Sequence, residues 1–275
     1  DGCGQHWLTC HGEVVPSAPE LKTIIEFSHR IMSALDGLIV LILIVWAIWI
    51  WRKDGTKSAV MKMAIGSFVF VLVEGLIGAG LVLTGNTAGS YSASRPLWAM
   101  GHLISTFILL TFMSLTAWYA SGGNVFSLRI ERKNLLLLGI GILGILLVGM
   151  SGSLAALSNM LFPSTSLAEG LAKDFSDTSH FLLRLRISHP IVSIATSVYL
   201  FFLSMWISKN SQDVWTKKFS GYLALLLIVQ VIFGGLTLVM LAPIVMQVGH
   251  LLLADLVWIM FVLMWAGFLA EKQKN

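Results

Sequence analysis

The sequence predicts an all-α polytopic membrane protein, and three observations carry this prediction. Of the 275 residues, 56% are hydrophobic and only 12% are charged, with a mean hydropathy of +0.84. Soluble domains carry about 25% charged residues, so this composition excludes a water-soluble domain. Seven apolar runs are long enough to cross about 30 Å of hydrocarbon, and too long for the strands of a membrane barrel. The third observation is an internal repeat, which predicts how the helices are arranged.

The seven predicted spans alternate with short connections, and their charges predict the topology. The spans cover residues 31–51, 63–84, 97–120, 134–160, 186–208, 218–241 and 247–270. Twelve of the 18 basic residues lie in or beside the connections on one side: Arg52, Lys53, Lys57, Lys62, Arg129, Arg132, Lys133, Lys209, Lys217, Lys218, Lys272 and Lys274. By the positive-inside rule that side is cytoplasmic. The N-terminus is therefore expected outside and the C-terminus in the cytoplasm. The net charge of +4 is thus a topology signal, and no nucleic-acid partner is expected.

The two halves of the chain repeat one another in the same direction. The segment at 27–49 resembles that at 187–207. Further pairs are Glu74 with Gln230, Gly78 with Gly234, and the Gly-His-Leu at 101–103 with that at 249–251. Parallel repeats of this kind build two similar bundles. The second half has four helices and the first only three, so the repeat predicts a further helix upstream of Asp1.

We therefore expect two parallel four-helix bundles, with seven of the eight helices in this chain. Residues 1–120 form the N-terminal half-bundle with its outer cysteine loop, and 121–133 form a cytoplasmic linker. Residues 134–275 form the C-terminal bundle.

Four histidines lie in or directly beside the apolar runs, one pair in each repeat. His29 pairs with His102, and His189 with His250, and each lies near the outer end of its helix. A lone buried histidine usually makes a core hydrogen bond, but ionisable groups inside a membrane mark functional sites by default. Two imidazoles that face each other across a bundle can ligate a heme iron axially, whereas zinc would need further ligands. The residues favour two hemes, one in each half.

Six basic residues remain on the outer side, and four of these lie within seven residues of a paired histidine. These four are Arg30, Arg95, Arg184 and Arg186. Heme propionates prefer the aqueous edge of a bundle, and arginine pairs well with carboxylates. We expect these arginines to bind propionates, with interfacial snorkelling as the alternative.

The repeats differ three residues before their first histidine, where the first half has Glu26 and the second has Arg186. A spacing of three places Glu26 and His29 on one helix face. A carboxylate beside a heme can accept a proton or hold a water. We therefore expect chemistry at the first site and electron storage or transfer at the second.

Other polar groups in the spans are Asp36, Glu74, Gln230 and Asp255. Hydrogen bonding between helices is the favoured role for these groups, and a proton path is the alternative. The only cysteines, Cys3 and Cys10, fall on the outer, oxidising side. A disulfide is the favoured role for them, and a redox function is the alternative.

These motifs together resemble the heme A synthases. The resemblance covers the chain from Asp1 to its end. It is carried by the Cys-x6-Cys-His-Gly loop at 3–12, Glu-Phe-Ser-His-Arg at 26–30, Gly-His at 101–102, MSGSLAALSNMLFPS at 150–164, LAEGLAKDFSDTSHFLLRLRISHP at 167–190, and GHLLLADLVWI at 249–259.

The resemblance implies an eight-helix oxidoreductase that converts the C8 methyl group of heme O to the formyl group of heme A for terminal-oxidase assembly. His29 and His102 would flank the substrate heme, and His189 and His250 would ligate a resident heme b. Glu26 would be the essential glutamate, and Cys3 and Cys10 the cysteine pair of the family.

Two other functions stay open from the residues: a diheme b-type electron-transfer cytochrome, and a heme-binding assembly factor without chemistry. We expect contact with membrane lipid, with heme O synthase or oxidase-assembly proteins, and with an electron partner of unknown identity. The sequence is also compatible with a homo-oligomer. Short loops favour a prokaryotic cytoplasmic membrane, and the mitochondrial inner membrane is the alternative.

Overall fold

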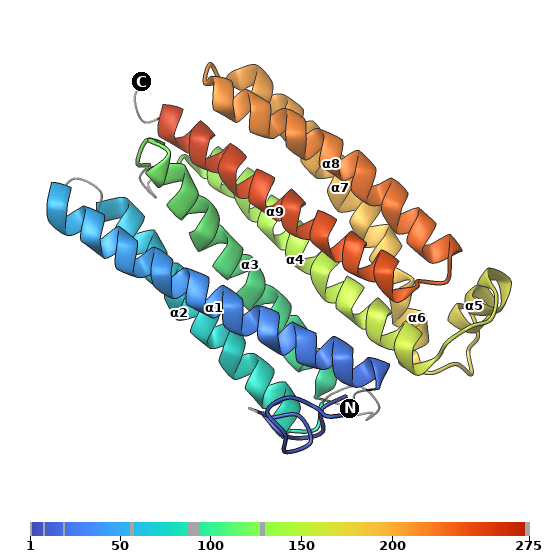
Figure 1. Cartoon of the computed structure of the whole chain (residues 1–275). Helices are drawn as coiled ribbons and strands as arrows, with labels where there is room; N and C mark the ends of the chain where they lie inside the picture. The colour runs from blue at the N-terminus through green and yellow to red at the C-terminus, as the bar shows by residue number, and fades with distance from the viewer. Residues whose placement is uncertain are drawn as a thin grey trace. The chain divides into compact units, whose positions relative to one another are not determined.

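The computed structural model describes residues 2–7, 9–18, 20–55, 58–86, 94–126 and 130–272. Across these ranges the regular structure is helical, with no strand (Figure 1). The helices are α1 (Leu21–Asp54), α2 (Ser58–Leu83), α3 (Arg95–Ala120), α4 (Arg132–Leu161), α5 (Leu167–Asp174), α6 (Phe181–Arg186), α7 (Ser188–Asn210), α8 (Val214–Val239) and α9 (Ile244–Lys272). Three basic residues used for the topology, Lys57, Arg129 and Lys274, lie outside the described residues.

Seven stretches among the described residues are long and apolar enough to cross a membrane, which confirms the predicted all-α polytopic fold. Six of them are single helices, and the fifth combines α6 and α7 over Phe181–Asn210. The first helix begins at Leu21, ten residues before the predicted span. These extra turns carry charges that lower the local hydropathy, but Glu26 and Arg30 form an ion pair one turn apart. Such pairs stabilise a helix.

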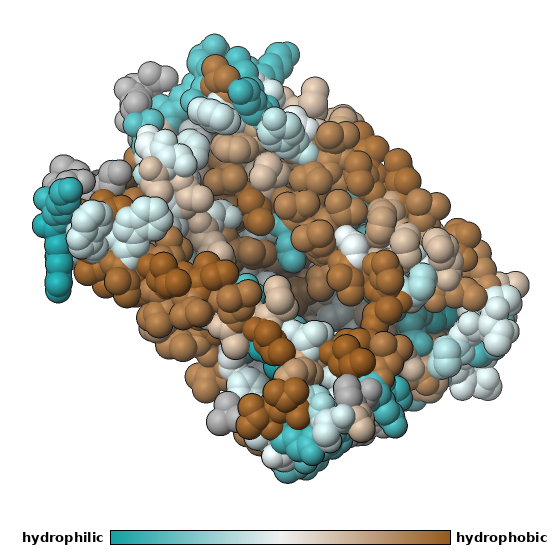
Figure 2. All heavy atoms as spheres, viewed as in Figure 1, coloured by the Kyte–Doolittle hydropathy of each residue, from teal (hydrophilic) through white to brown (hydrophobic). Residues whose placement is uncertain are grey.

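The apolar surface of the long helices supports their membrane assignment. Helix α7 exposes a row of large apolar side chains at helical spacing, namely Ile191, Ile194, Val198, Phe202 and Met205. A row of this kind needs an apolar solvent. In Figure 2, hydrophobic residues cover the sides of the helices, and hydrophilic residues gather towards their ends.

The chain divides into two compact units, residues 1–116 and 117–275, with the boundary near the end of α3. In the first unit, α1 packs along α2. Helix α3 meets α2 through Phe112, whose ring stacks on Phe70 with centroids 5.6 Å apart. At the other end of this pair, the Trp98 ring lies over Gly80. The small residue lets the two helices approach closely.

The second unit contains a closed four-helix bundle. Helix α4 packs against α7, α7 against α8, α8 against α9, and α9 returns to α4. The Tyr199 hydroxyl donates to the Leu137 carbonyl at 2.8 Å and ties α7 to α4. At one end of this bundle, α5 and α6 form a short helical loop that the span prediction left out. Ser166 caps α5 by accepting from the Glu169 amide at 3.2 Å, because helix N-termini carry free N–H groups.

Candidate functional site

Two of the predicted histidines meet in the second unit. His189 lies in the first turn of α7, and His250 lies near the start of α9. Their ring centroids are 6.2 Å apart, and the ring planes are nearly perpendicular, at 89°. An imidazole nitrogen binds a metal at about 2 Å, so two axial imidazoles have centroids roughly 6 Å apart. The pair therefore has the spacing of two rings on opposite sides of one metal ion.

Hydrogen bonds orient the His189 ring. Its Nδ1 lies 3.2 Å from the Val148 carbonyl and 3.3 Å from the Ser151 hydroxyl, both on α4. A carbonyl only accepts, so Nδ1 carries the proton and Nε2 keeps its lone pair. A ring nitrogen with a free lone pair is the form that binds metals. The facing His250 has a buried Nδ1 with no hydrogen-bond partner in the part of the chain that the structure describes.

Two glycines make room for these rings. A Cβ atom added to Gly152 of α4 would lie 3.0 Å from Cε1 of His189. A Cβ atom added to Gly234 of α8 would lie 2.8 Å from Cε1 of His250, closer than real Cβ contacts occur. Each histidine ring is thus placed over a backbone position that has no side chain. The span pattern did not single out these glycines as site residues, although Gly234 is part of the repeat.

The first unit does not bring its two histidines into ring contact among the described residues. His102 of α3 is partly exposed, and its Nδ1 contacts Oε2 of Glu74 on α2. The Thr106 hydroxyl lies 3.2 Å from the other carboxylate oxygen of Glu74. His29 lies on an exposed part of α1, and so does Asp36 two turns further along. The role predicted for His29 and His102 stays a prediction.

Glu26 connects α1 to the cysteine loop. One carboxylate oxygen accepts from the Gly2 and Cys3 amides at 2.9 and 3.2 Å, and the other pairs with Arg30 at 2.6 Å. Cys3 and Cys10 are buried and joined by a disulfide. The Glu26 carboxylate is therefore placed by both the loop backbone and an arginine.

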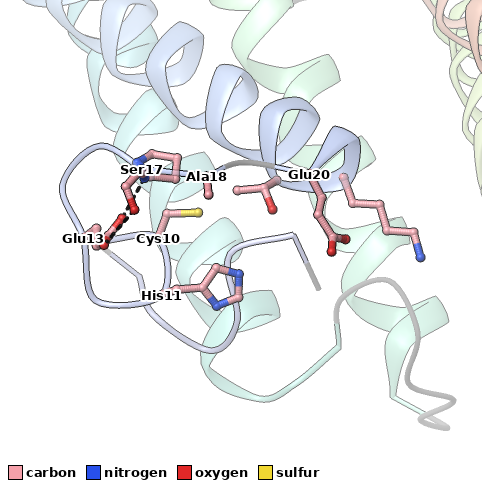
Figure 3. A pocket seen from close by; sticks show the side chains of 9 residues that line it. Cys10, His11, Glu13, Ser17, Ala18 and Glu20 are labelled. Atoms are coloured by element: carbon pink, nitrogen blue, oxygen red, sulfur yellow. Dashed lines mark hydrogen bonds between the residues drawn. The ribbon is translucent and has the colours of Figure 1, made fainter.

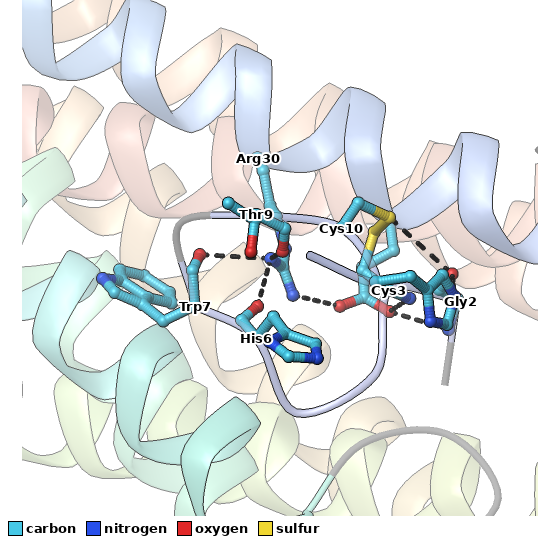
Figure 4. A network of polar contacts seen from close by, with 9 residues as sticks. Gly2, Cys3, His6, Trp7, Thr9, Cys10 and Arg30 are labelled. Carbon is cyan, nitrogen blue, oxygen red and sulfur yellow. Dashed lines mark hydrogen bonds and ion pairs between the residues drawn. A yellow bond between two sulfur atoms is a disulfide. The ribbon is translucent and has the colours of Figure 1, made fainter. Parts of the chain in front are cut away.

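Arg30 holds the opposite side of the same loop. Its guanidinium donates to the carbonyls of His6, Trp7 and Thr9 at 2.6, 3.1 and 2.9 Å (Figure 4). Arg30 is thus one turn from Glu26 and fastened to loop backbone, whereas the prediction assigned it to a propionate. The propionate role stays untested.

A polar hollow opens beside the cysteine loop and is lined by His11, Glu13 and Glu20, among others (Figure 3). His11 Nε2 lies 2.8 Å from the Gly2 carbonyl, and Glu13 accepts from the Ser17 amide at 2.8 Å. None of the four paired histidines lines this hollow. It is part of the loop structure, and its lining is mostly polar.

The outer arginines of the second unit differ in their surroundings. Arg186 is nearly buried and donates to Asp174 at 2.6 Å, to Asn159 at 2.7 Å and to the Gly170 carbonyl at 3.0 Å. This network fastens α5 and α6 onto the end of α4. Arg184, two residues earlier on α6, is exposed.

Arg95, the fourth arginine expected to bind a propionate, is the first residue of α3 in the first unit and is half-buried.

The described residues contain no group of three or more His, Cys, Asp or Glu side chains placed to share a metal ion. A structural zinc site needs about four such ligands. A porphyrin supplies four equatorial nitrogens itself, so a pair of histidines is a complete protein ligand set for heme iron. The geometry of the second unit fits a heme better than a bare metal ion.

Comparisons with known proteins show the family of the chain. A family model described as cytochrome oxidase assembly protein matches residues 1–262. Two protoheme IX farnesyltransferases from Thermus thermophilus strains are 40% and 39% identical over 274 residues, covering 100% of this chain and 45% of theirs. The heme A synthase of Halalkalibacterium halodurans is 42% identical over 116 residues, covering 42% of this chain and 36% of its own. The chain thus spans less than half the length of the two Thermus relatives, and its match to the heme A synthase covers about a third of that protein. No solved structure matches it.

Proposed function

The chain belongs to the family of cytochrome oxidase assembly proteins, which includes heme A synthases, and from this premise we propose that it converts heme O to heme A. The proposed reaction oxidises the C8 methyl group of heme O to a formyl group. Because the chain spans less than half the length of the Thermus relatives, the activity of the whole protein is part of the proposal.

The ring pair of His189 and His250 carries the proposal. These two side chains would hold a resident heme b, and their centroid separation of 6.2 Å leaves room for a metal ion between the rings. The His189 proton lies on Nδ1, towards α4, which leaves Nε2 for the iron. Gly152 and Gly234 keep side chains away from both rings. When bound, heme b supplies one-electron transfer.

Arginines near the helix ends are the proposed propionate partners. Arg184 is exposed and lies on α6, next to the His189 end of the bundle. Arg186 already makes three contacts to protein atoms. Its proposed contribution to heme binding is to hold the helical loop in place, with its remaining N–H groups directed to a propionate.

In the first unit we assign His29 and His102 to the substrate heme and Glu26 to catalysis. Glu26 is held by the Cys3 amide and by Arg30, so the disulfide loop fixes the position of its carboxylate. A carboxylate three residues from His29 shares a helix face with it. The Glu26 oxygens would accept protons released at the substrate or orient the attacking water.

The proposed chemistry proceeds in stages that balance. The methyl group takes up the oxygen of one water and loses two electrons and two protons, which gives the alcohol. A second oxidation of the same size gives the hydrated aldehyde, which loses water to leave the formyl group. An outer electron acceptor takes the electrons, and Glu26 handles protons at its Oε atoms.

Heme extraction tests the proposal. The full-length protein should yield heme O, hydroxylated heme or heme A beside heme b when its extracted hemes are separated by chromatography. Heme b alone, at two per chain, would support a diheme electron-transfer cytochrome. Glu26→Gln should abolish heme A formation, because the amide cannot accept a proton, whereas Glu20→Gln at the exposed start of α1 should not. Unchanged heme A output in Glu26→Gln would remove Glu26 from the mechanism.

The proposal extends to the membrane location of the protein and to the source of its substrate. The predicted topology places the basic connections in the cytoplasm and the cysteine loop outside a prokaryotic cytoplasmic membrane. The Thermus relatives are named for farnesyl transfer to protoheme IX. Heme O is a farnesylated heme, so an enzyme of that class is the proposed supplier of the substrate.

A further inference from the structure

Helix α5 of the helical loop is held against the second unit by its polar side. It lies beside α6 at one end of the four-helix bundle (Figure 1). Gly170 and Asp174 are buried and lie one turn apart on α5. The Gly170 carbonyl and the Asp174 carboxylate accept from the Arg186 guanidinium at 3.0 and 2.6 Å. These contacts fix which side of α5 faces the protein.

The side of α5 that points away from Arg186 is apolar and exposed. This apolar side consists of Ala168, Leu171, Ala172 and, directly after the helix, Phe175. Their spacing of three and four residues places them on one helix face. Leu171 is 44% exposed and Phe175 is 74% exposed. Scattered exposed apolar residues are ordinary, but a whole helix side of them indicates contact with apolar material.

A third side of α5 is polar and suits water. Glu169 and Lys173 form an ion pair at 2.7 Å, and about a third of each side chain is exposed. The Thr165 amide also donates to the Glu169 carboxylate at 2.8 Å. One short helix therefore presents separate sides to protein, to water and to apolar material. A helix that lies in the interface between a membrane and water has these surroundings.

The neighbouring helices extend the exposed apolar surface. Phe181 and Leu185 of α6 are 49% and 43% exposed, and the exposed row of α7 begins at Ile191. Helices α6 and α7 together form one stretch that is long and apolar enough to cross a membrane, Phe181–Asn210. Arg184 is also exposed on α6, and a long arginine side chain can extend from apolar surroundings to polar headgroups.

We propose that the helical loop is an interfacial segment whose apolar side lies in phospholipid at the membrane surface. The loop connects the ends of two membrane-spanning helices, α4 and α7, so lipid is close to it. The exposed surface of α6 and α7 continues into the hydrocarbon, which favours lipid over a protein as the occupant. Arg186 joins α5 to Asn159 of α4 and lies three residues before His189. The lipid contact thus supports the end of the bundle that holds the histidine pair.

Spin labels on single introduced cysteines test the proposal in the full-length protein. Cys3 and Cys10 are the only cysteines of this chain and are joined in a disulfide; any cysteine outside the chain is replaced by serine. The labelled protein is reconstituted into vesicles of phosphatidylcholine and phosphatidylglycerol. Electron paramagnetic resonance then gives the collision rates of each label with oxygen, which concentrates in lipid, and with a water-soluble nickel chelate.

The ratio of oxygen to chelate collisions should be several-fold higher for Phe175→Cys than for Asp177→Cys. Asp177 is the matched control, since it is exposed two residues further along the same loop. Phe202→Cys in the exposed row of α7 calibrates the ratio in hydrocarbon.

Equal ratios at positions 175 and 177 would overturn the inference, because the apolar side would then face water. Low collision rates with both reagents at position 175 would overturn it as well, because a protein surface would then cover the label. If Phe175→Cys does not fold, Leu171→Cys on the same side of α5 decides by the same criteria. The outcome does not depend on heme chemistry, so it stands apart from the proposed function.

Discussion

The substitution Gly234→Ala is expected to weaken the binding of the heme that we assign to His189 and His250. A Cβ atom on Gly234 lies 2.8 Å from Cε1 of His250, and ordinary contacts of this kind begin at 3.4 Å. The ring must therefore move by about 0.6 Å, the difference between the two distances, which exceeds the roughly 0.5 Å tolerance of a ligand site. Overpacking of this kind costs about 1–3 kcal/mol.

That energy corresponds to roughly 5- to 150-fold weaker heme binding. The assay is the heme content per polypeptide after purification in detergent, read from the spectrum in alkaline pyridine. Gly235→Ala is the matched control, since a Cβ atom there meets nothing within 4 Å. Equal heme content in the two variants and the parent would refute the assignment of His250 as a ligand.

The same reasoning applies on the facing side of the pair. A Cβ atom on Gly152 lies 3.0 Å from Cε1 of His189, whereas one on Gly139 of the same helix meets nothing within 4 Å. Gly152→Ala should therefore lower the heme content, by less than Gly234→Ala, and Gly139→Ala should leave it unchanged.

Two further predictions concern the helical loop of the second unit. Asp174→Ala leaves the Arg186 guanidinium, which is 12% exposed, without its carboxylate partner. The loss should lower the free energy of unfolding by about 3 kcal/mol and therefore lower the thermal midpoint in detergent. The double variant with Arg186→Met should recover the midpoint, and an unchanged midpoint in Asp174→Ala would contradict the prediction. The pKa of Glu169 is lowered from its ordinary 4.5 to about 2, mainly by the hydrogen bond with Lys173 and further by hydrogen bonds from Thr165. The stabilisation of α5 by this carboxylate is therefore complete above pH 4.5 and is lost as the pH falls through about 2. NMR of the Glu169 carboxyl carbon should show that midpoint, and a midpoint near 4.5 would disprove it.

The span boundaries show which features of the fold can be predicted from the local sequence. Seven apolar runs predicted seven spans, since hydropathy over one helix length needs no knowledge of neighbouring helices. The prediction placed the start of α1 at residue 31, whereas the helix begins at Leu21. The charged first turns of α1 and the short helices α5 and α6 are too polar to be found by hydropathy. Ion pairs and capping hydrogen bonds stabilise them.

The candidate site was predictable only where a pattern in the sequence marks its residues. The repeat singled out His189 and His250 as a pair, and the structure brings their rings to 6.2 Å. It did not predict the partners of Arg186, which lie 12 to 27 residues away in the chain. Contacts of that range depend on how a loop folds back on a helix, which no local pattern contains.

Hydropathy and helical period are properties of one segment at a time, so the amino-acid sequence alone was enough to predict the all-α membrane fold, the parallel repeat and four histidines near helix ends. Which ring atoms have partners depends on contacts between helices. Glu74 reaches His102 while Gln230 turns to the His250 backbone, and Gly234 lies under the His250 ring. These contacts form between helices, and their distances depend on side-chain rotamers and helix spacing, which the linear chain leaves open.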